Sequence, residues 1–186
     1  MTVDDCLLAA DVADAFCSKE IRLTVDQHII FPNVDSTKVD EMLKMPFFEK
    51  FPVDQGDIVS QLVSCTGAEF CSFGLVETKH KGISLARKLD AALDFPEGTK
   101  APRIHWTGCP NSCGQAQIGD IGLMGAPARV NKKAVEGVNI FLGGKIGGEH
   151  GLGEIVQKGV PAEEDLLFPV LRDICIEHFG AVKKRS

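Results

Sequence analysis

The sequence predicts an α+β fold in two parts, a small α/β unit followed by a larger mixed α/β unit. Apolar residues recur at helical period over residues 2–17, and polar and apolar residues then alternate over residues 20–25, as in a strand. Pro and Gly interrupt residues 46–56, where we expect the boundary between the units. Beyond it, predicted strands and helices share residues 57–183 of the 186-residue chain, which is long enough for one domain or two small ones.

The first unit, residues 1–50, is expected to contain two helices and two short strands. Thr2 or Asp4 is a suitable N-cap for the first helix, and Ser36 for the second. Pro32 ends the second strand because it has no N–H to donate. The helices are predicted over residues 2–17 and 36–45, and the strands over residues 20–25 and 28–31.

In the second unit, two predicted strands each lead into a pair of cysteines. They cover residues 57–63 and 103–106, with a helix that ends near Leu93 between them. Residues 118–124 and 138–142 are expected to form paired strands joined by a polar connection over residues 131–137. A Gly-rich segment follows, and then a last helix with Pro161 as its first residue, ended by Gly180.

The composition is that of an ordinary globular protein and excludes several classes of function. Hydrophobic residues make up 44% and charged residues 25% of the chain. The net charge of −6 argues against nucleic-acid binding, which needs a basic face. No apolar run approaches the length of a membrane span, and no signal or transit peptide is visible. Seven cysteines, an odd number, then indicate a soluble protein with reduced thiols rather than a disulfide framework.

Four of the seven cysteines lie in two pairs, each after a predicted strand. Five residues separate Cys65 from Cys71, and three separate Cys109 from Cys113. Both loops are rich in Gly, Ser, Thr and Pro, so the backbone can wrap closely around a bulky group and direct N–H donors toward sulfur. Cysteine thiolates hold iron–sulfur clusters. Spacing and composition therefore favour a four-cysteine cluster site.

Two other accounts of these cysteines stay open. Free cysteines are often buried as small apolar side chains, although four in two loop-borne pairs are unusual in that role. Structural zinc sites use pairs separated by about two to four residues, which suits the second pair better than the first. The remaining cysteines, on the first and last predicted helices, are expected to fill the core: Cys6, Cys17 and Cys175.

The motifs around the cysteines resemble those of a known family. CTGAEFC, followed by GCPNSCGQAQIGDIGLMG, is similar to the cluster-binding segment of the siroheme-containing nitrite and sulfite reductases. EIRLTVDQHII resembles a strand pair of that family's ferredoxin-like half domain, and VNIFLGGKIG with the closing helix resembles its C-terminal end. The residues SCGQA after GCPN are similar to the ferredoxin-dependent nitrite reductases rather than to the sulfite reductases.

This resemblance implies domains, cofactors and ligands. Residues 1–50 would be a partial ferredoxin-like half domain, and residues 57–183 the 4Fe-4S and siroheme domain. Cys65, Cys71, Cys109 and Cys113 would hold a [4Fe–4S] cluster. Cys113 would also bridge the cluster to the siroheme iron as its axial ligand, which makes it the catalytic residue. The joined cofactors would pass electrons one at a time to the substrate.

The resemblance also implies an activity and partners. The reaction would be the assimilatory reduction of nitrite to ammonia, with ferredoxin as electron donor, in a plastid stroma or a cytoplasm. Family members are much longer and have two pseudo-symmetric halves, of which this chain resembles the second. We therefore expect a fragment with little activity alone, whose N-terminal half is supplied in cis or in trans. Alternatives are a sulfite reductase fragment and a non-catalytic iron–sulfur electron-transfer module.

Other polar residues near the cysteine pairs are weaker candidates. Four basic residues after the first pair fit a solvated helix face better than an anion site: Lys79, Lys81, Arg87 and Lys88. Four residues flanking the second pair are candidates for contact with a cofactor: Arg103, His105, Gln115 and Gln117. The Gly-rich segment 143–153, which contains Lys145, lacks the phosphate-loop pattern and is expected to form tight turns.

Overall fold

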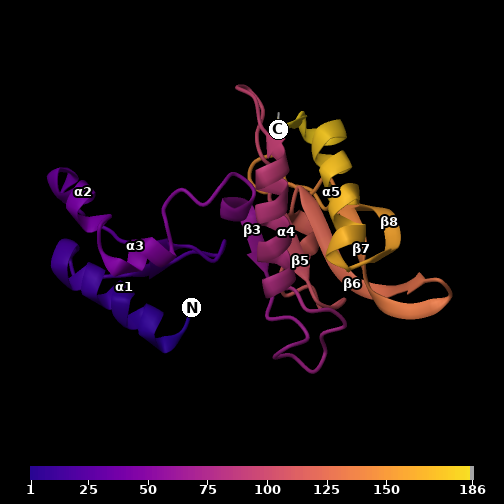
Figure 1. Cartoon of the computed structure of the whole chain (residues 1–186), viewed down its shortest axis with the longest axis horizontal. Coiled ribbons are helices and arrows are strands. Elements are labelled where there is room, and N and C mark those ends of the chain that lie inside the picture. Colours follow the sequence, from indigo (N-terminus) through magenta and orange to yellow (C-terminus); the bar gives the residue numbers. More distant parts are fainter. Residues whose placement is uncertain (185–186) are drawn as a thin grey trace. The chain divides into compact units, whose positions relative to one another are not determined.

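The computed structural model describes residues 1–184, which form two compact units (Figure 1). The first unit covers Met1–Gln55 and the second begins at Gly56. Among the described residues, no helix combines the length and the apolar character that crossing a membrane requires.

The first unit begins with helix α1 (Val3–Phe16), as the sequence predicts. Thr2 is its N-cap: the Thr2 hydroxyl accepts the Asp5 N–H at 3.3 Å, and the Asp5 carboxylate accepts the Thr2 N–H at 2.6 Å. This reciprocal capping box satisfies N–H groups that have no partner inside the helix. Asp5 also accepts a hydrogen bond from Lys50 Nζ at 2.6 Å, so the start of α1 is tied to α3 (Pro46–Lys50).

The rest of the first unit departs from the sequence prediction in detail. Strands β1 (Arg22–Leu23) and β2 (Ile29–Ile30) pair antiparallel but are shorter than predicted. Asp35, not Ser36, caps the 3-10 turn η1 (Ser36–Lys38), because its carboxylate accepts the Thr37 N–H at 2.9 Å. The short helix α2 (Val39–Met42) follows directly. Helix α3 occupies a segment predicted as loop. Its apolar side chains complete a core that Pro and Gly signals did not reveal: Ala9, Val12, Met42, Phe47 and Phe48.

The second unit is built on a mixed sheet with the strand order β3-β5-β6-β7-β8. Strands β3 (Leu62–Ser64), β5 (Ile104–Thr107) and β6 (Ile121–Val130) run parallel to one another. Strands β7 (Lys133–Leu142) and β8 (Glu154–Pro161) continue the sheet antiparallel. The β6–β7 hairpin is longer than predicted because Asn131 and Lys132, both at positive φ, turn the chain within two residues.

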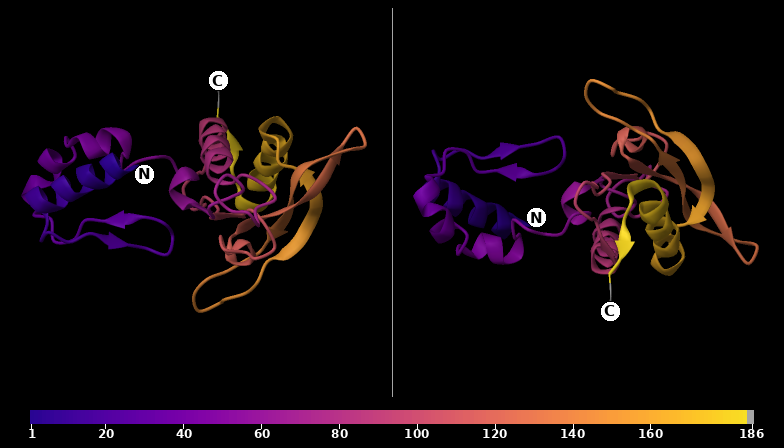
Figure 2. Two further views of the ribbon diagram at one scale, coloured as in Figure 1. Left: turned by 90° about the horizontal axis from the view of Figure 1, so that it is seen from below. Right: turned by 90° about the horizontal axis from the view of Figure 1, so that it is seen from above.

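Helices α4 (Lys79–Ala92) and α5 (Glu164–Phe179) lie beside each other and pack on this sheet (Figures 1 and 2). They bury a core that includes Leu85, Leu89, Trp106, Leu167 and Leu171. Ile83 of α4, by contrast, is 40% exposed. Gly180, at φ 69°, ends α5 as predicted, and the chain then pairs β9 (Val182–Lys183) with β4 (Leu93–Asp94).

Two expectations for the second unit were wrong. Residues 57–63 are not one strand, because a 3-10 turn, η2 (Val59–Gln61), precedes the short β3. The Asp90 carboxylate of α4 stabilises this turn by accepting the N–H groups of Ile58 and Val59 at 2.8 and 3.0 Å. Pro161 does not begin the last helix. It ends β8, an edge strand where a missing N–H is tolerated, and α5 begins at Glu164.

Candidate iron–sulfur site

The two cysteine-bearing loops leave the sheet side by side. Cys65 follows the last residue of β3, and Cys109 comes two residues after the end of β5. These strands are parallel neighbours with Ser64 paired to Trp106, so their carboxyl ends meet at one edge of the sheet. The Cys65 N–H continues this pairing by donating to the Trp106 carbonyl at 3.0 Å. The fold therefore brings together two loops that are far apart in the sequence.

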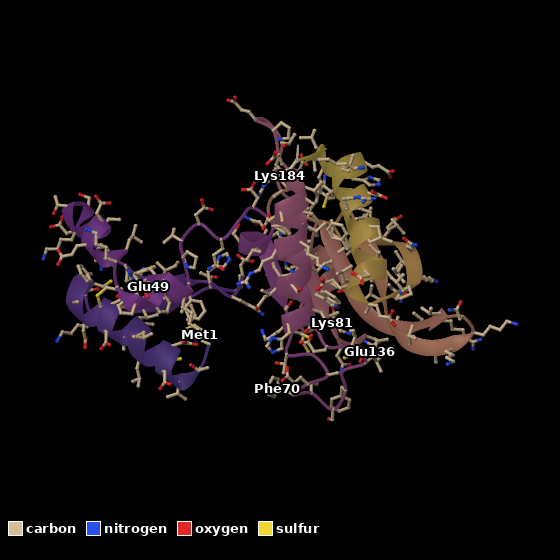
Figure 3. All side chains as sticks on the ribbon, in the orientation of Figure 1. Met1, Glu49, Phe70, Lys81, Glu136 and Lys184 are labelled. Carbon is tan, nitrogen blue, oxygen red and sulfur yellow. The ribbon has the colours of Figure 1, made fainter. Side chains whose placement is uncertain are left out.

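The first loop, residues 65–78, is a compact turn made possible by two glycines. Gly67 lies at φ 77°, and its carbonyl accepts the Cys71 N–H at 3.0 Å. Gly74 packs against Ala68 so closely that an added Cβ would lie 2.6 Å from the Ala68 Cα. The Ala68 N–H donates to the Val76 carbonyl at 3.1 Å and closes the loop. Phe70 lies at the tip of this loop, away from the sheet, with 74% of its surface exposed (Figure 3).

The second loop, residues 108–119, holds Cys113 between two residues in the left-handed region. Ser112 has φ 55° and Gln115 has φ 57°, a conformation that costs about 1–2 kcal/mol for a side chain with a Cβ. The Ser112 hydroxyl donates to the Gln117 side-chain oxygen, so the conformation has a compensating contact. A turn, η3 (Ala116–Ile118), then returns the chain to the start of β6.

Backbone hydrogen bonds join the two loops. The Leu75 N–H donates to the Gly108 carbonyl at 2.8 Å, and the Gly108 N–H donates to Cys65 Sγ at 3.1 Å. A backbone N–H aimed at a cysteine sulfur is the contact expected where a thiolate carries negative charge. Gly125 of β6 packs against Gly108 so closely that an added Cβ would lie 2.5 Å from the Gly108 carbonyl carbon.

The four cysteines differ in accessibility. Cys109 is buried, Cys65 and Cys71 are half-buried, and Cys113 is exposed. Within residues 1–184, no group of three or more His, Cys, Asp or Glu side chains is arranged to hold a single metal ion.

Arg103 and His105 stabilise the base of the second loop. The Arg103 guanidinium forms a two-point pair with Asp120, at 3.0 and 3.1 Å, and donates to the Ile118 carbonyl at 3.1 Å. The buried His105 ring lies with Nδ1 3.0 Å from the Gly114 carbonyl oxygen. Both side chains therefore support the loop that carries Cys109 and Cys113. The sequence did not reveal the role of Asp120, because Asp120 and Arg103 precede two different strands, β6 and β5, that are neighbours only in the folded sheet.

Three of the four basic residues that follow the first loop make local contacts. Lys79 Nζ donates to the Ser64 carbonyl at 3.2 Å, and Lys81 Nζ lies 2.5 Å from a Glu136 carboxylate oxygen (Figure 3). Lys88 pairs with Glu164, which raises the pKa of the Lys88 ammonium. Ion pairs of this kind are typical of a solvated helix face, which is the interpretation favoured by the sequence.

The three other cysteines do not share one environment. Cys175 is buried in the main core, and burial, with a smaller effect of the Asp90 charge, raises the pKa of its thiol to about 12. Cys17 is half-buried, and burial raises the pKa of its thiol. Cys6 is exposed, so the expectation that it fills the core was wrong. Helical period places a residue on a face but does not show which faces are covered.

Comparison with known sequences identifies both parts of the chain. Residues 55–180 match the sequence profile described as the nitrite and sulphite reductase 4Fe-4S domain. Residues 1–46 match the nitrite/sulfite reductase ferredoxin-like half domain.

Curated relatives include the ferredoxin–nitrite reductases of Leptolyngbya laminosa and Synechococcus elongatus. The first is 47% identical over 94% of this chain and 34% of its own length, and the second 45% identical over 97% and 34%. The chloroplastic ferredoxin–nitrite reductase of Spinacia oleracea is 42% identical over 94% of this chain and 29% of its own length. The chain therefore spans about a third of the length of the curated relatives it matches.

Solved structures share the fold. The Mycobacterium tuberculosis NirA protein superposes with a TM-score of 0.77 at 23% identity, over 95% of this chain and 33% of its own. Dissimilatory sulfite reductase I superposes with a TM-score of 0.71 at 13% identity, over 96% of this chain and 60% of its own. Since the 4Fe-4S profile matches more than half of the chain, the protein belongs to the nitrite and sulphite reductase family.

Proposed function

We propose that this chain is the cluster-binding part of a ferredoxin-dependent nitrite reductase, which reduces nitrite to ammonia. The observation that carries the proposal is the pair of cysteine loops at adjacent carboxyl ends of parallel strands, hydrogen-bonded to each other within the segment that matches the family's 4Fe-4S profile. Relatives named ferredoxin–nitrite reductase, at 42–47% identity, support nitrite rather than sulfite as the substrate.

Membership of this family implies two cofactors, a [4Fe–4S] cluster and siroheme. We assign the cluster to the four loop cysteines: Cys65, Cys71, Cys109 and Cys113. The site suits a cluster in two respects. Its loops pack closely through glycines that have no side chain to block the backbone, and the Gly108 N–H is directed at a cysteine sulfur.

Cys113 is the residue we assign to both cofactors. It is the exposed member of the set, so its sulfur is accessible to a group that lies outside the loop. The left-handed residues on either side of it fix the backbone that presents it. When bound, the two cofactors supply one-electron transfer to the substrate. The chain's own contribution is to hold the four thiolates on loops fixed by backbone hydrogen bonds.

The partners follow from the same assignment. Ferredoxin is the electron donor and nitrite the substrate, and the part of the enzyme corresponding to the other two thirds of its relatives acts in cis or in trans. Because the chain spans only about a third of the length of these relatives, a second candidate is retained, a non-catalytic iron–sulfur electron-transfer module. Cyanobacterial and chloroplastic relatives support a cytoplasm or a plastid stroma as the site of action.

The first test is the metal content of the chain purified without oxygen and supplied with iron, sulfide and siroheme. Iron and acid-labile sulfide in about equal amounts are expected for a cluster. Zinc without sulfide would contradict the proposal. Siroheme retained with the cluster would separate the reductase assignment from the electron-transfer module.

The assignment of Cys113 is tested by comparing Cys113→Ser with Cys6→Ser, a change at an exposed cysteine outside the loops. Cys113→Ser is expected to abolish the magnetic coupling between cluster and siroheme, because it removes the shared thiolate. Cys6→Ser is expected to leave the coupling unchanged. Unchanged coupling in Cys113→Ser would show that another residue joins the two groups.

A further inference from the structure

Thr78 stands at the N-cap position of α4 but does not cap the helix. It is fully buried, and its side chain accepts no hydrogen bond from the first turn. Threonine at this position normally accepts the N–H of the second or third helical residue. Here the Glu77 carboxylate does so instead, because its two oxygens accept the N–H groups of His80 and Lys81, each at 3.0 Å. The Thr78 hydroxyl is therefore available for another contact.

That contact is with Cys65. The Thr78 hydroxyl donates to the Cys65 carbonyl at 2.7 Å and lies 3.7 Å from Cys65 Sγ. The same sulfur accepts the Gly108 N–H at 3.1 Å. A backbone donor from the second loop and a side-chain hydroxyl from the start of α4 thus both lie within hydrogen-bond distance of one cysteine sulfur.

The packing of the first loop brings Thr78 to this position. Gly67, at φ 77°, lies against it so closely that an added Cβ would be 2.7 Å from the Thr78 nitrogen and 2.8 Å from its hydroxyl oxygen. Only glycine allows that approach at this backbone conformation. The loop is therefore shaped around the Thr78 hydroxyl as well as around its cysteines.

We propose that Thr78 is a positioning residue that orients Cys65 and tunes the cluster through its sulfur. This rests on the proposed function, in which Cys65 is a cluster ligand. A ligating thiolate has no proton, so it can only accept. Rotation about the Thr78 Cβ–Oγ bond turns the hydroxyl proton from the Cys65 carbonyl toward Sγ without moving a heavy atom. Hydrogen bonds to ligand sulfurs stabilise the more negative, reduced cluster, and so raise its reduction potential.

The test compares three variants of the full chain after anaerobic reconstitution of the cluster. Thr78→Val removes the hydroxyl and keeps the shape of the side chain, whereas Thr78→Ser keeps the hydroxyl. Thr107→Val is the matched control. Thr107 is also fully buried, and its hydroxyl donates to a cysteine carbonyl, that of Cys109, at 3.4 Å. Among the described residues it makes no hydrogen bond to a sulfur. The midpoint potential is measured by titration followed by electron paramagnetic resonance.

Thr78→Val is expected to lower the ratio of reduced to oxidised cluster about tenfold at a fixed potential. This corresponds to a midpoint potential lower by about 59 mV for a one-electron couple. Thr78→Ser is expected to restore the wild-type potential, and Thr107→Val to leave it unchanged. A cluster that forms only with Thr or Ser at position 78 would also support the inference.

Three results would overturn it. An unchanged potential in Thr78→Val, with the wild-type chain holding iron and sulfide, refutes the role of Thr78 and leaves the proposed function standing. Equal shifts in Thr78→Val and Thr78→Ser would mean that the residue acts by packing alone. A wild-type chain that binds zinc without sulfide refutes the proposed function and the inference with it.

Discussion

Gly114→Ala tests whether close backbone packing holds the two cysteine loops together. An added Cβ at this position would lie closer than 3.0 Å to the Trp106 carbonyl oxygen and 3.3 Å from the Cys65 nitrogen. Those two atoms are hydrogen-bonded to each other at 3.0 Å, in the bond that continues the β3–β5 pairing into the first loop. Alanine therefore has to displace either the second loop or the start of the first.

The cost follows from these contacts. Forcing a methyl group into a packed site costs about 1–3 kcal/mol, and a lost backbone hydrogen bond adds about 0.5–1.5 kcal/mol. Alanine reduces the conformational freedom of the unfolded chain, which offsets about 0.4–1 kcal/mol. At the midpoints of these ranges, the net destabilisation is about 2 kcal/mol. With a urea m-value of about 2 kcal/mol/M, the unfolding midpoint falls by about 1 M.

Urea unfolding followed by tryptophan fluorescence measures this effect in the second unit alone. The chain has one tryptophan, and Trp106 is 1% exposed in the core of that unit. Gly148→Ala is the matched control, since no atom lies within 4 Å of a Cβ added there. It is expected to change stability by less than about 0.5 kcal/mol. A Gly114→Ala midpoint as close to wild type as that of Gly148→Ala would refute the packing argument.

Three further predictions concern other parts of the chain. The hydrogen bond from Lys50 lowers the pKa of Asp5 from 3.8 to about 2, so this contact stabilises the first unit above pH 3.8 and is lost as the pH falls toward 2. Lys50→Met should raise the Asp5 pKa in an NMR titration, and an unchanged pKa would contradict the role of Lys50. Burial raises the pKa of the Cys175 thiol from 9.0 to about 12. Iodoacetamide at pH 8 should therefore modify the exposed Cys6 in the native chain and leave Cys175 unlabelled until the chain unfolds. Labelling of Cys175 before unfolding would show that the core around it opens. Lys132→Gly should stabilise the second unit by about 0.5–1 kcal/mol in urea unfolding, because Lys132 lies at φ 68° in the β6–β7 turn, where glycine is not strained. A lower unfolding midpoint would mean that the lost side chain contributes more than the relieved strain.

The cysteine loops show how far residue pattern alone can lead. The pairing of cysteines, their spacing and the small residues around them are enough to indicate a cluster site, because each is a property of a short stretch of chain. The long helices were also predictable, because Thr2 and Gly180 mark a start and an end with local chemistry.

Errors in the prediction arose where a distant contact decides local structure. Residues 57–61 form turns because the Asp90 carboxylate, about thirty residues later, accepts their N–H groups. Strand β8 was missed because Pro161 has the same local signature at the end of an edge strand as at the start of a helix. Neither distinction is present in a short window of sequence.

The sequence by itself determined the family resemblance, the four candidate ligands and the main helices, since each depends on residue types at short spacing. Only the tertiary structure decided that the two loops meet, because that follows from the parallel pairing of β3 with β5. It also decided the role proposed for Thr78. Its hydroxyl is directed to Cys65 because Glu77 caps α4 and Gly67 leaves it room, and these contacts exist only in the folded chain.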